Sequence, residues 1–435
     1  MKIAYIATGA ANMYCGSCMR DNTLVAAMKK AGHDVVMVPL YTPLRVDEES
    51  VSEKRVFYGG IEAYFLQKYP NPSIWRDLLL KMAGSQAVLR LLPKFDIGSA
   101  VDPAQNAELT LSMLRGEAGN QSSLLEEMLD WLTTSLKPDM VHITNTLISG
   151  PAKAIKEALN VPVVCGLHGE DVFIDGLPDH YRQQAIAQIH ANCAHIDHFI
   201  SISHYYADYF GELVGIEKEK ITVVPPGIAL EDYKNLPVSR SENGAQTIGY
   251  LARLSQEKGF HILADAYIQL VKSGEFPELK LKVAGYLSKA YRPYVDGVCK
   301  KLERAGVMAN VEILGTVDRQ QKLDFFRSID LFSLPTVYRD PKGLPVLEAL
   351  AAGVPVVQPD HGAFPYLVEA TGGGLLHEPE NADDLAEKLA LLLKDEELRQ
   401  RLERNGRNKV HSYFSAERMA EETMRVYRQV VASPN

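Results

Sequence analysis

The chain has 435 residues, of which 46% are hydrophobic, and its formal net charge is −9. This length predicts two domains with separate cores, and the acidic balance argues against a nucleic-acid partner. Five cysteines, an odd number, exclude a disulfide framework and fit a reducing compartment. The first apolar run is too short for a signal peptide, and no uncharged run approaches the roughly 18 residues of a membrane span. We therefore expect a soluble cytoplasmic protein.

The first half of the chain alternates short apolar runs with segments of helical spacing. Residues 2–7 and 34–40 have the pattern of strands, and residues 22–31 have that of a helix ending at Gly32. A strand, a helix and a second strand in this order predict a parallel sheet. Four later runs continue the pattern, at 139–144, 161–167, 198–203 and 221–227. We place a first Rossmann-like domain at residues 1–235.

A polar stretch at 235–246 reads as a linker, and the alternation then restarts. Strands are predicted at 247–254, 280–286, 311–317, 330–335 and 354–359, with helices at 259–271, 291–305, 319–328 and 345–352. We place a second Rossmann-like domain at residues 245–412, followed by a last helix within 413–435. The fold class is thus α/β with two doubly wound parallel sheets, and ligands of such sheets bind beyond the carboxyl ends of the strands.

The stretch RDPKGLPVLEALAAGVPVV combines a glycine loop with the start of a helix. Asp340 and Glu348 are eight positions apart with Gly343 between them, and Pro345 suits the first helical turn. Free backbone amides there fit an anion or sugar hydroxyls. We place Glu348 in the first turn, where a carboxylate is favoured and can accept hydrogen bonds from a vicinal diol such as ribose. The plain alternative is a helix cap with an exposed acid.

Two cations follow the first strand of the second domain. Arg253 lies at the strand end, and Lys258 opens the next helix. A guanidinium fork and a compact ammonium beside a helix N-terminus suit a diphosphate. The alternative is a solvated surface pair, which is the commoner situation of an Arg and a Lys.

These motifs resemble a known family. In order, ARLSQEKGF, LPTVYRDPKGLPVLEALAAGVPVV and GGGLLHEPENADDLAEKL resemble the nucleotide-binding half of family 4 glycosyltransferases, which are retaining enzymes of the GT-B fold. In the first half, LHGED, ISIS and ITVVPPGI resemble the same family. The resemblance implies two domains facing a cleft, a last helix (413–435) that returns to the first domain, and transfer of a hexose-type sugar from a UDP-, GDP- or ADP-sugar without a cofactor.

The resemblance also implies roles for single residues. Arg253 and Lys258 would hold the donor diphosphate and stabilise the leaving group, and Glu348 would bind the donor ribose. Asp340 stands where the family has a glutamate near the sugar hydroxyls, with a shorter side chain. His168 would approach the transferred sugar from the first domain.

Further donor contacts are implied for the backbone and for the base pocket. The amides of Lys342, Gly343 and Leu344 would face the sugar and phosphate, whereas a proline has no amide to offer. Thr316 and Val317 would line the pocket for the base. No Asp-x-Asp triplet occurs in the sequence, so we expect no divalent metal at the donor site.

The first loop contains a Cys-x-x-Cys pair, Cys15 and Cys18. By resemblance, Cys15 and Gly16 stand in the family's Gly-Gly position, where Gly16 lets the backbone approach the diphosphate or the acceptor. Two other interpretations remain open. One is a redox pair activated by the helix N-terminus. The other is a zinc site completed by Cys165 and His168.

Other function classes were weighed against sugar transfer. A sugar-nucleotide epimerase and a non-catalytic nucleotide-sugar-binding protein on the same fold remain alternatives, although the sequence lacks the extra acid–base carboxylates expected of an epimerase. A dehydrogenase fits worse, because the first loop lacks Gly-x-Gly-x-x-Gly spacing.

The acceptor is left open by the sequence, since residues 45–135 match no known pattern. Within them, residues 74–95 read as a basic amphipathic helix, which would lie on the inner face of an anionic membrane and favour a lipid-linked acceptor. The alternative is a helix packed in the acceptor domain or in a homodimer contact. A sugar or another small molecule also remains open as the acceptor.

Overall fold

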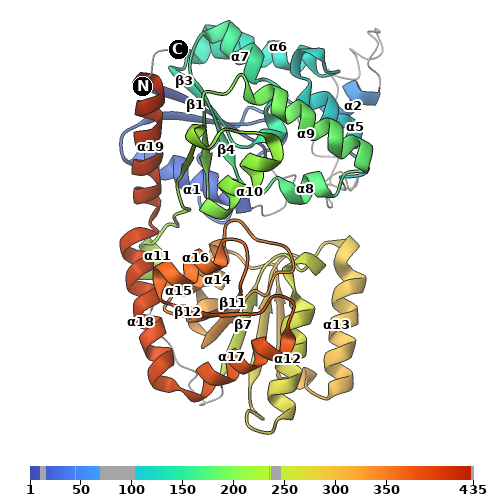
Figure 1. Ribbon diagram of the computed structural model, residues 1–435, viewed down its shortest axis with the longest axis vertical. Coiled ribbons are helices and arrows are strands. Elements are labelled where there is room, and N and C mark those ends of the chain that lie inside the picture. Colours follow the sequence, from blue (N-terminus) through green and yellow to red (C-terminus); the bar gives the residue numbers. More distant parts are fainter. Residues whose placement is uncertain (10–15, 45, 69–102, 235, 237–245, 433–435) are drawn as a thin grey trace. The chain divides into compact units, whose positions relative to one another are not determined.

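The computed structural model of the chain describes residues 1–9, 16–44, 46–68, 103–234, 236 and 246–432 (Figure 1). The chain forms two compact units, Met1–Pro225 with Met419–Asn435, and Pro226–Arg418. The basic segment predicted at 74–95, Cys15 and most of the predicted linker lie outside the described residues. In the described part, no helix combines the length and the apolar character needed to cross a bilayer.

The division between the units falls after Pro225 rather than at the predicted residue 235. The segment that follows belongs to the second unit because its backbone pairs there: Ile228 donates to Phe414 O, and Ala416 donates to Ile228 O. Ile228 and Tyr233 are buried in the core of the second unit. At the other end, the residues from Met419 onward belong to the first unit.

The first unit is built on a six-stranded sheet in which every strand pair is parallel, with the order β2-β1-β3-β4-β5-β6. Its strands are almost entirely apolar and buried, as expected of a parallel sheet with helices on its two faces. The strands are β1 Lys2–Ala7, β2 Asp34–Pro39, β3 Met140–Ile143, β4 Val163–Leu167, β5 His198–Ser201 and β6 Ile221–Val223. Each one overlaps a strand predicted from the sequence.

Helices connect and cover these strands. They are α1 Gly16–Lys30, α2 Gly60–Lys68, α5 Ala107–Leu114, α6 Ser122–Trp131, α7 Ala152–Leu159, α8 Asp171–Asp175, α9 Asp179–Cys193, α10 His204–Val214 and α19 Ala416–Ala432. Helix α1 begins at Gly16 and not at residue 22 as predicted. The apolar spacing missed its first turns because Arg20, Asp21 and Asn22 are polar and yet buried.

The second unit repeats the architecture with a parallel sheet of order β12-β11-β10-β7-β8-β9. Its strands are β7 Thr247–Leu251, β8 Lys280–Ala284, β9 Val311–Gly315, β10 Leu331–Ser333, β11 Val356–Pro359 and β12 Gly374–His377. Its helices are α11 Glu231–Lys234, α12 Phe260–Lys272, α13 Arg292–Ala305, α14 Arg319–Arg327, α15 Leu344–Ala351, α16 Phe364–Thr371, α17 Ala382–Lys394 and α18 Glu396–Tyr413. Strand β12 and helices α17 and α18 were not predicted as elements.

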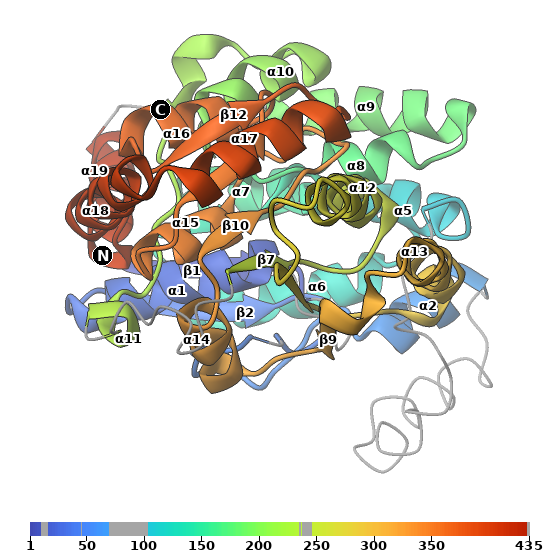
Figure 2. The same ribbon diagram turned by 90° about the horizontal axis from the view of Figure 1, so that it is seen from below.

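Figure 2 shows how the helices of the second unit cover its sheet. Helices α12, α13 and α17 lie on one face, with α12 and α17 side by side, and α14, α15 and α16 lie on the other. The helices change face because the chain runs from β7 outward to β9 and then returns to β10 beside β7. The loops after β7 and β10 therefore leave the sheet in opposite directions, which is the arrangement that opens a ligand crevice.

Candidate functional site

The loops after β7 and β10 bring together residues that are far apart in the sequence. β7 and β10 are adjacent parallel strands, with Leu331 paired to Ile248. At their carboxyl ends, the Lys258 Nζ lies 2.9 Å from the Asp340 Oδ2. The predicted pairing of this lysine and this loop at one site is therefore present in the structure, between residues 82 positions apart.

Asp340 is the hydrogen-bonding centre of this site, which we call the Asp340 cluster: Asp340, Lys258, Tyr338, Lys342 and Gly343. Its Oδ2 accepts from the Lys258 ammonium at 2.9 Å and from the Tyr338 hydroxyl at 2.6 Å. Its Oδ1 accepts from the backbone amides of Lys342 at 2.9 Å and Gly343 at 3.2 Å. Lys258 also donates to the Tyr338 hydroxyl at 2.6 Å.

This geometry revises two sequence expectations. Both oxygens of Asp340 are already engaged, so the carboxylate anchors its own loop and Lys258 in place of presenting a bare edge to a ligand. The amides of Lys342 and Gly343 donate to Asp340, whereas the Leu344 amide does not. The reason is the short side chain of aspartate, which reaches amides two and three residues ahead as in an Asx turn.

The charges of the cluster are strongly coupled. Burial by itself raises the pKa of Asp340, but the positive charges of Lys258 and Lys342 and the Tyr338 hydroxyl hold it well below its usual range. Burial lowers the pKa of Lys258, and Arg253 and Lys342 lower it further, while Asp340 opposes the shift. These mutual effects place Arg253, Lys258 and Lys342 in one electrostatic neighbourhood around a single carboxylate.

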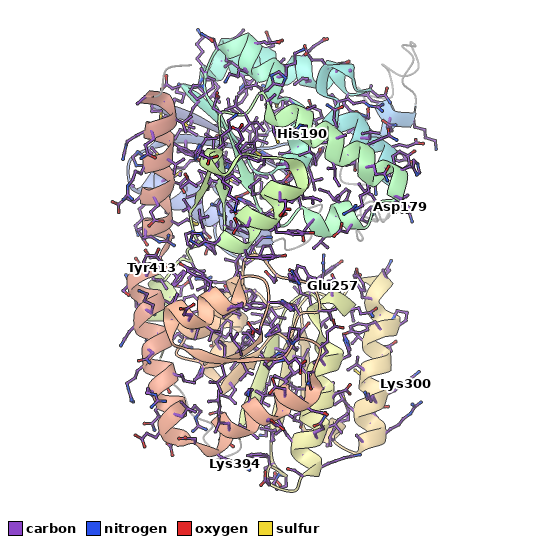
Figure 3. All side chains as sticks on the ribbon, viewed as in Figure 1. Asp179, His190, Glu257, Lys300, Lys394 and Tyr413 are labelled. Atoms are coloured by element: carbon purple, nitrogen blue, oxygen red, sulfur yellow. The ribbon has the colours of Figure 1, made fainter. Side chains whose placement is uncertain are left out.

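Arg253 is the most accessible cation of this group, with 41% of its side chain exposed. It donates to the Glu257 Oε1 at 2.6 Å, and the Ser255 hydroxyl donates to the same oxygen. Figure 3 labels Glu257 on the loop between β7 and α12. Although burial raises it, the pKa of Glu257 is lowered overall by Ser255, by a backbone amide and by Arg253. A guanidinium on this loop can therefore exchange its carboxylate for an incoming anion.

The helix that follows the loop begins where the sequence predicted. Gly343 caps α15 at φ +65°, and a Cβ there would lie 2.4 Å from Leu367 Cδ1, so glycine is required on both counts. Pro345 is in the first turn, as predicted. Glu348, however, is the fifth residue of α15 and belongs to its second turn, so its expected placement beside the helix N-terminus is wrong.

Glu348 is buried and paired, which the sequence did not show. Its Oε1 accepts from the ammonium of Lys322, a residue of α14, and from the Tyr233 hydroxyl at 3.4 Å. Lys322 and Glu348 are only 5% and 7% exposed. The sequence signal that could have indicated Lys322 is its place in α14, where a lysine precedes the apolar run Leu323 to Phe326.

The two residues expected to line a base pocket lie apart from the Asp340 cluster in the hydrogen-bond network. Thr316 is exposed and Val317 packs against the core of the second unit, both just after the edge strand β9. Among the described residues, no hydrogen bond or ion pair joins either of them to Asp340 or Glu348. Their role in base binding stays a prediction.

In the first unit, His168 follows β4 and is 2% exposed. Its Nδ1 lies 3.7 Å from the Asp21 Oδ1, and its backbone amide donates to the Glu170 Oε2 at 2.7 Å. Burial raises the pKa of Glu170, whose carboxylate also accepts from the Tyr206 hydroxyl at 2.8 Å. The structure thus places His168 in a buried polar region and not on an open surface.

Asp21 is the centre of that region, which we call the Asp21 cluster: Asp21, Arg20, Tyr5, Thr144 and His168. Its Oδ1 accepts from the Tyr5 hydroxyl at 2.7 Å and from Arg20 Nη1 at 3.0 Å, and its Oδ2 accepts from the Thr144 hydroxyl. Burial nevertheless raises the pKa of Asp21, although Arg20 and the two hydroxyls oppose it. Sequence reasoning missed Arg20 and Asp21, whose only signal is their position in the first helix after β1.

Gly16 and the cysteines occupy the same part of the first unit. Gly16 is the first residue of α1 and is exposed, whereas Cys18 is buried in that helix. Cys165 is fully buried in β4, and burial raises the pKa of its thiol, which disfavours the thiolate that a zinc ligand requires. Within the described residues, which do not include Cys15, no group of three or more His, Cys, Asp or Glu is placed to hold a metal.

Comparison with protein families assigns both halves of the chain. The family described as glycosyl transferases group 1 matches residues 233–409, and the family described as glycosyltransferase family 4 matches residues 114–232. Together the two matches extend over well more than half of the sequence. The chain belongs to the family 4 type of glycosyltransferases.

Known relatives agree with this assignment. An uncharacterized glycosyltransferase of Methanocaldococcus jannaschii is 25% identical over 303 residues, covering 67% of this chain and 75% of the relative. Glycogen synthase of Mycobacterium tuberculosis is 28% identical over 300 residues, covering 67% of this chain and 69% of the relative. Mannosylfructose-phosphate synthase of Agrobacterium fabrum is 27% identical over 229 residues, half of each chain.

Solved structures share the fold. The Anabaena protein HepE in complex with UDP superposes with a TM-score of 0.69 at 16% identity, covering 99% of this chain and 100% of its own. Sucrose-phosphate synthase from Thermosynechococcus elongatus superposes with a TM-score of 0.70 at 19% identity over 100% of both chains. With its two parallel-sheet units, this glycosyltransferase has the GT-B fold, as predicted.

Proposed function

We propose that this glycosyltransferase moves a hexose from a nucleotide-sugar donor to an acceptor with retention of configuration, and without a metal ion. The observation that carries the proposal is the Asp340 cluster at the carboxyl ends of β7 and β10, with Lys258 buried against Asp340 and Arg253 exposed nearby. Three cations, Arg253, Lys258 and Lys342, influence one another there. Such a concentration of positive charge suits a diphosphate.

The charge balance of the site supports a dianionic ligand. Asp340 offsets Lys258 and Glu257 offsets Arg253, so Lys342 remains as the extra positive charge. A diphosphate that displaces Glu257 from Arg253 would meet two cations, Arg253 and Lys342, whose charges match its own. Lys258 stays behind them, held by Asp340 and Tyr338, and adds a fixed positive potential.

The reaction follows from these charges. The bond between the sugar C1 and the phosphate oxygen breaks, and its electron pair leaves on the diphosphate. The acceptor hydroxyl oxygen forms the new bond to C1 on the face from which the diphosphate departs, and its proton passes to a departing phosphate oxygen. Arg253, Lys258 and Lys342 stabilise the charge that develops on the diphosphate, which is the service a divalent cation would otherwise supply.

The donor class is supported by what is known of similar proteins. HepE was solved with UDP-glucose, and the names of two relatives describe synthesis of glycogen and of mannosylfructose phosphate. A hexose donor is the simplest common feature of these names. We propose that Glu348 accepts hydrogen bonds from the ribose of that donor, and that Thr316 and Val317 contact its base. His168 remains proposed as a contact to the transferred sugar.

Donor binding and product analysis test the proposal. The protein is titrated with UDP-, GDP- and ADP-glucose in the presence of EDTA, and binding is followed by calorimetry and by the shift in melting temperature. We expect one donor to bind, slow release of its nucleotide, and an axial or equatorial product linkage that matches the donor when read by NMR. Absence of binding by all donors, or full dependence on added Mg²⁺, would contradict the proposal.

Glu348→Gln supplies the residue-level test. The variant keeps the size of the side chain but removes its charge, so we expect donor affinity to fall by about tenfold or more. Exchange of Gln320, an exposed residue of α14, for Ala is the matched control and should leave affinity unchanged. Equal affinities of Glu348→Gln and the wild type would remove Glu348 from the site.

A further inference from the structure

Glu348 is held through one of its two oxygens. Lys322 and Tyr233 both donate to Oε1. No hydrogen bond from any described residue reaches Oε2. The carboxylate is 7% exposed, so it retains a small accessible edge within an otherwise buried setting. A carboxylate in this condition has one oxygen committed to the protein and one available to a ligand.

The cation that holds Glu348 is itself firmly placed. Lys322 lies in the first half of α14, and the N-terminus of this helix is closed by a capping box in which Asp318 and Gln321 exchange hydrogen bonds. The Lys322 side chain is 6% exposed, and lysines are almost never buried to this degree unless they are paired. A rigid helix thus carries a buried ammonium directly to the Oε1 of Glu348.

We propose that Lys322 is a positioning residue that fixes Glu348 with Oε1 turned into the protein and Oε2 presented to the vicinal hydroxyls of the donor ribose. This inference rests on the proposed function and adds to it a residue with no expected role in the chemistry. Without the ammonium, Oε1 and Oε2 become equivalent, and the carboxylate loses the orientation that lets it accept from both hydroxyls at once. Preorganisation of this kind lowers the cost of binding.

A purely structural ion pair would behave differently from a positioning one. If Lys322 served only to neutralise a buried charge, its loss would destabilise the second unit and weaken all nucleotides alike. If it positions Glu348, its loss weakens only ligands that carry the ribose diol. The ratio of affinities for a ribonucleotide and its 2′-deoxy counterpart therefore separates the two roles.

The experiment measures this ratio by calorimetry on the full chain. UDP, ADP and GDP are each compared with the 2′-deoxy form, and the base that binds the wild type best is used thereafter. For the wild type we expect a preference for the ribonucleotide of about tenfold or more. In Lys322→Met the preference should fall to about twofold or less, through weaker ribonucleotide binding with little change for the deoxynucleotide. Tyr233→Phe removes only the 3.4 Å contact and should keep most of the preference.

Two controls keep the result interpretable. Circular dichroism and melting temperature show whether Lys322→Met is folded; if it is not, the pair Lys322→Met with Glu348→Gln, which carries no unbalanced charge, is compared with Glu348→Gln alone. The inference predicts equal ratios for these two proteins, and a further drop on removal of Lys322 would overturn it. Lys322→Arg, which keeps a cation on α14, should recover part of the preference.

The outcomes separate the inference from the function on which it rests. A folded Lys322→Met with an unchanged ribose preference would overturn the inference and leave sugar transfer untouched. Failure of the wild type to bind any of the six nucleotides would instead contradict the proposed function. A wild type that binds nucleotides without a ribose preference would overturn the ribose role of Glu348 and the positioning role of Lys322 together.

Discussion

Each unit of this glycosyltransferase buries an aspartate beside a cation near the carboxyl ends of its strands, and the two aspartates behave in opposite ways. In the Asp21 cluster, burial prevails and the pKa of Asp21 is raised despite the adjacent Arg20. In the Asp340 cluster, the pKa of Asp340 is lowered although burial alone would raise it. The difference therefore lies in the donors and charges that surround each carboxylate.

Asp21 receives one guanidinium and two hydroxyls, whereas Asp340 receives an ammonium, a hydroxyl and two backbone amides, with Lys342 adding a second positive charge. Backbone amides are fixed dipoles that need no rearrangement, and a second cation adds long-range attraction in a low-dielectric setting. A buried carboxylate thus keeps its charge when the loop around it supplies amides as well as a counterion. The same loop is the one proposed to bind the donor.

The largest effect is expected from Lys258→Met, which breaks the Asp340 cluster. The variant leaves Asp340 buried without its main counterion, at a cost of about 3–5 kcal/mol to the second unit. It also removes a cation from the proposed leaving-group site, so kcat/KM for sugar transfer should fall by about 100-fold or more. Steady-state kinetics and thermal melting measure the two effects. Lys258→Arg should recover part of the stability, and wild-type kinetics in Lys258→Met would contradict the proposed role.

Asp340→Asn should show a pH dependence that follows the lowered pKa. At neutral pH the wild type should exceed the variant by about 3 kcal/mol, because the charge-assisted bonds to Lys258 are lost. A carboxyl whose pKa is lowered on folding stabilises the protein above its unfolded pKa of about 4, and this contribution is lost as the pH falls through the folded value. Melting temperatures of both proteins from pH 7 to pH 3 should therefore converge toward acid.

Asp21→Asn should show the opposite trend and a smaller effect. At neutral pH we expect a loss of about 2 kcal/mol, because removal of a buried charge partly offsets the loss of the partner of Arg20. A carboxyl whose pKa is raised on folding binds its proton more tightly in the folded state, so the wild-type advantage is greatest below about pH 4 and falls as the pH rises. Parallel pH trends for Asp21→Asn and Asp340→Asn would refute the contrast between the clusters.

The smallest effect is expected beside the Asp21 cluster, at the contact between α19 and the first unit. The Tyr427 hydroxyl lies 2.8 Å from the His142 Nδ1, and burial lowers the pKa of His142, which keeps the ring neutral and able to accept. Tyr427→Phe removes this one bond, so we expect a loss of about 1 kcal/mol with no change in nucleotide affinity. Thermal melting and calorimetry check the two parts; a change in affinity would show that the contact does more than attach the helix.

Much of the fold could be predicted because its strands are apolar on both faces and lie between helices of regular spacing. The predictions failed where that periodicity is absent. The start of α1 was missed because Arg20, Asp21 and Asn22 occupy buried positions that apolar residues normally fill. Strand β12 was missed because it is a four-residue edge strand that begins with glycine.

The site was predicted in part for a similar reason. Arg253, Lys258, Asp340 and Glu348 could be found because polar residues after buried strands mark the carboxyl edge of a sheet, and their spacing resembles a known family. Their partners could not. Lys322 lies on a different helix from Glu348, and nothing in the local sequence indicates that its ammonium is buried or which carboxylate it meets.

The sequence by itself determined the α/β architecture, the two parallel sheets and the positions of the chemically active loops, because these depend on periodicity and on residues close to one another in the chain. Only the tertiary structure decided that Asp340 anchors its own loop, that Glu348 is paired with Lys322, and that His168 lies beside Asp21. Those facts depend on which side chains meet after residues far apart are packed together, and burial and charge at such meetings set the pKa of each group.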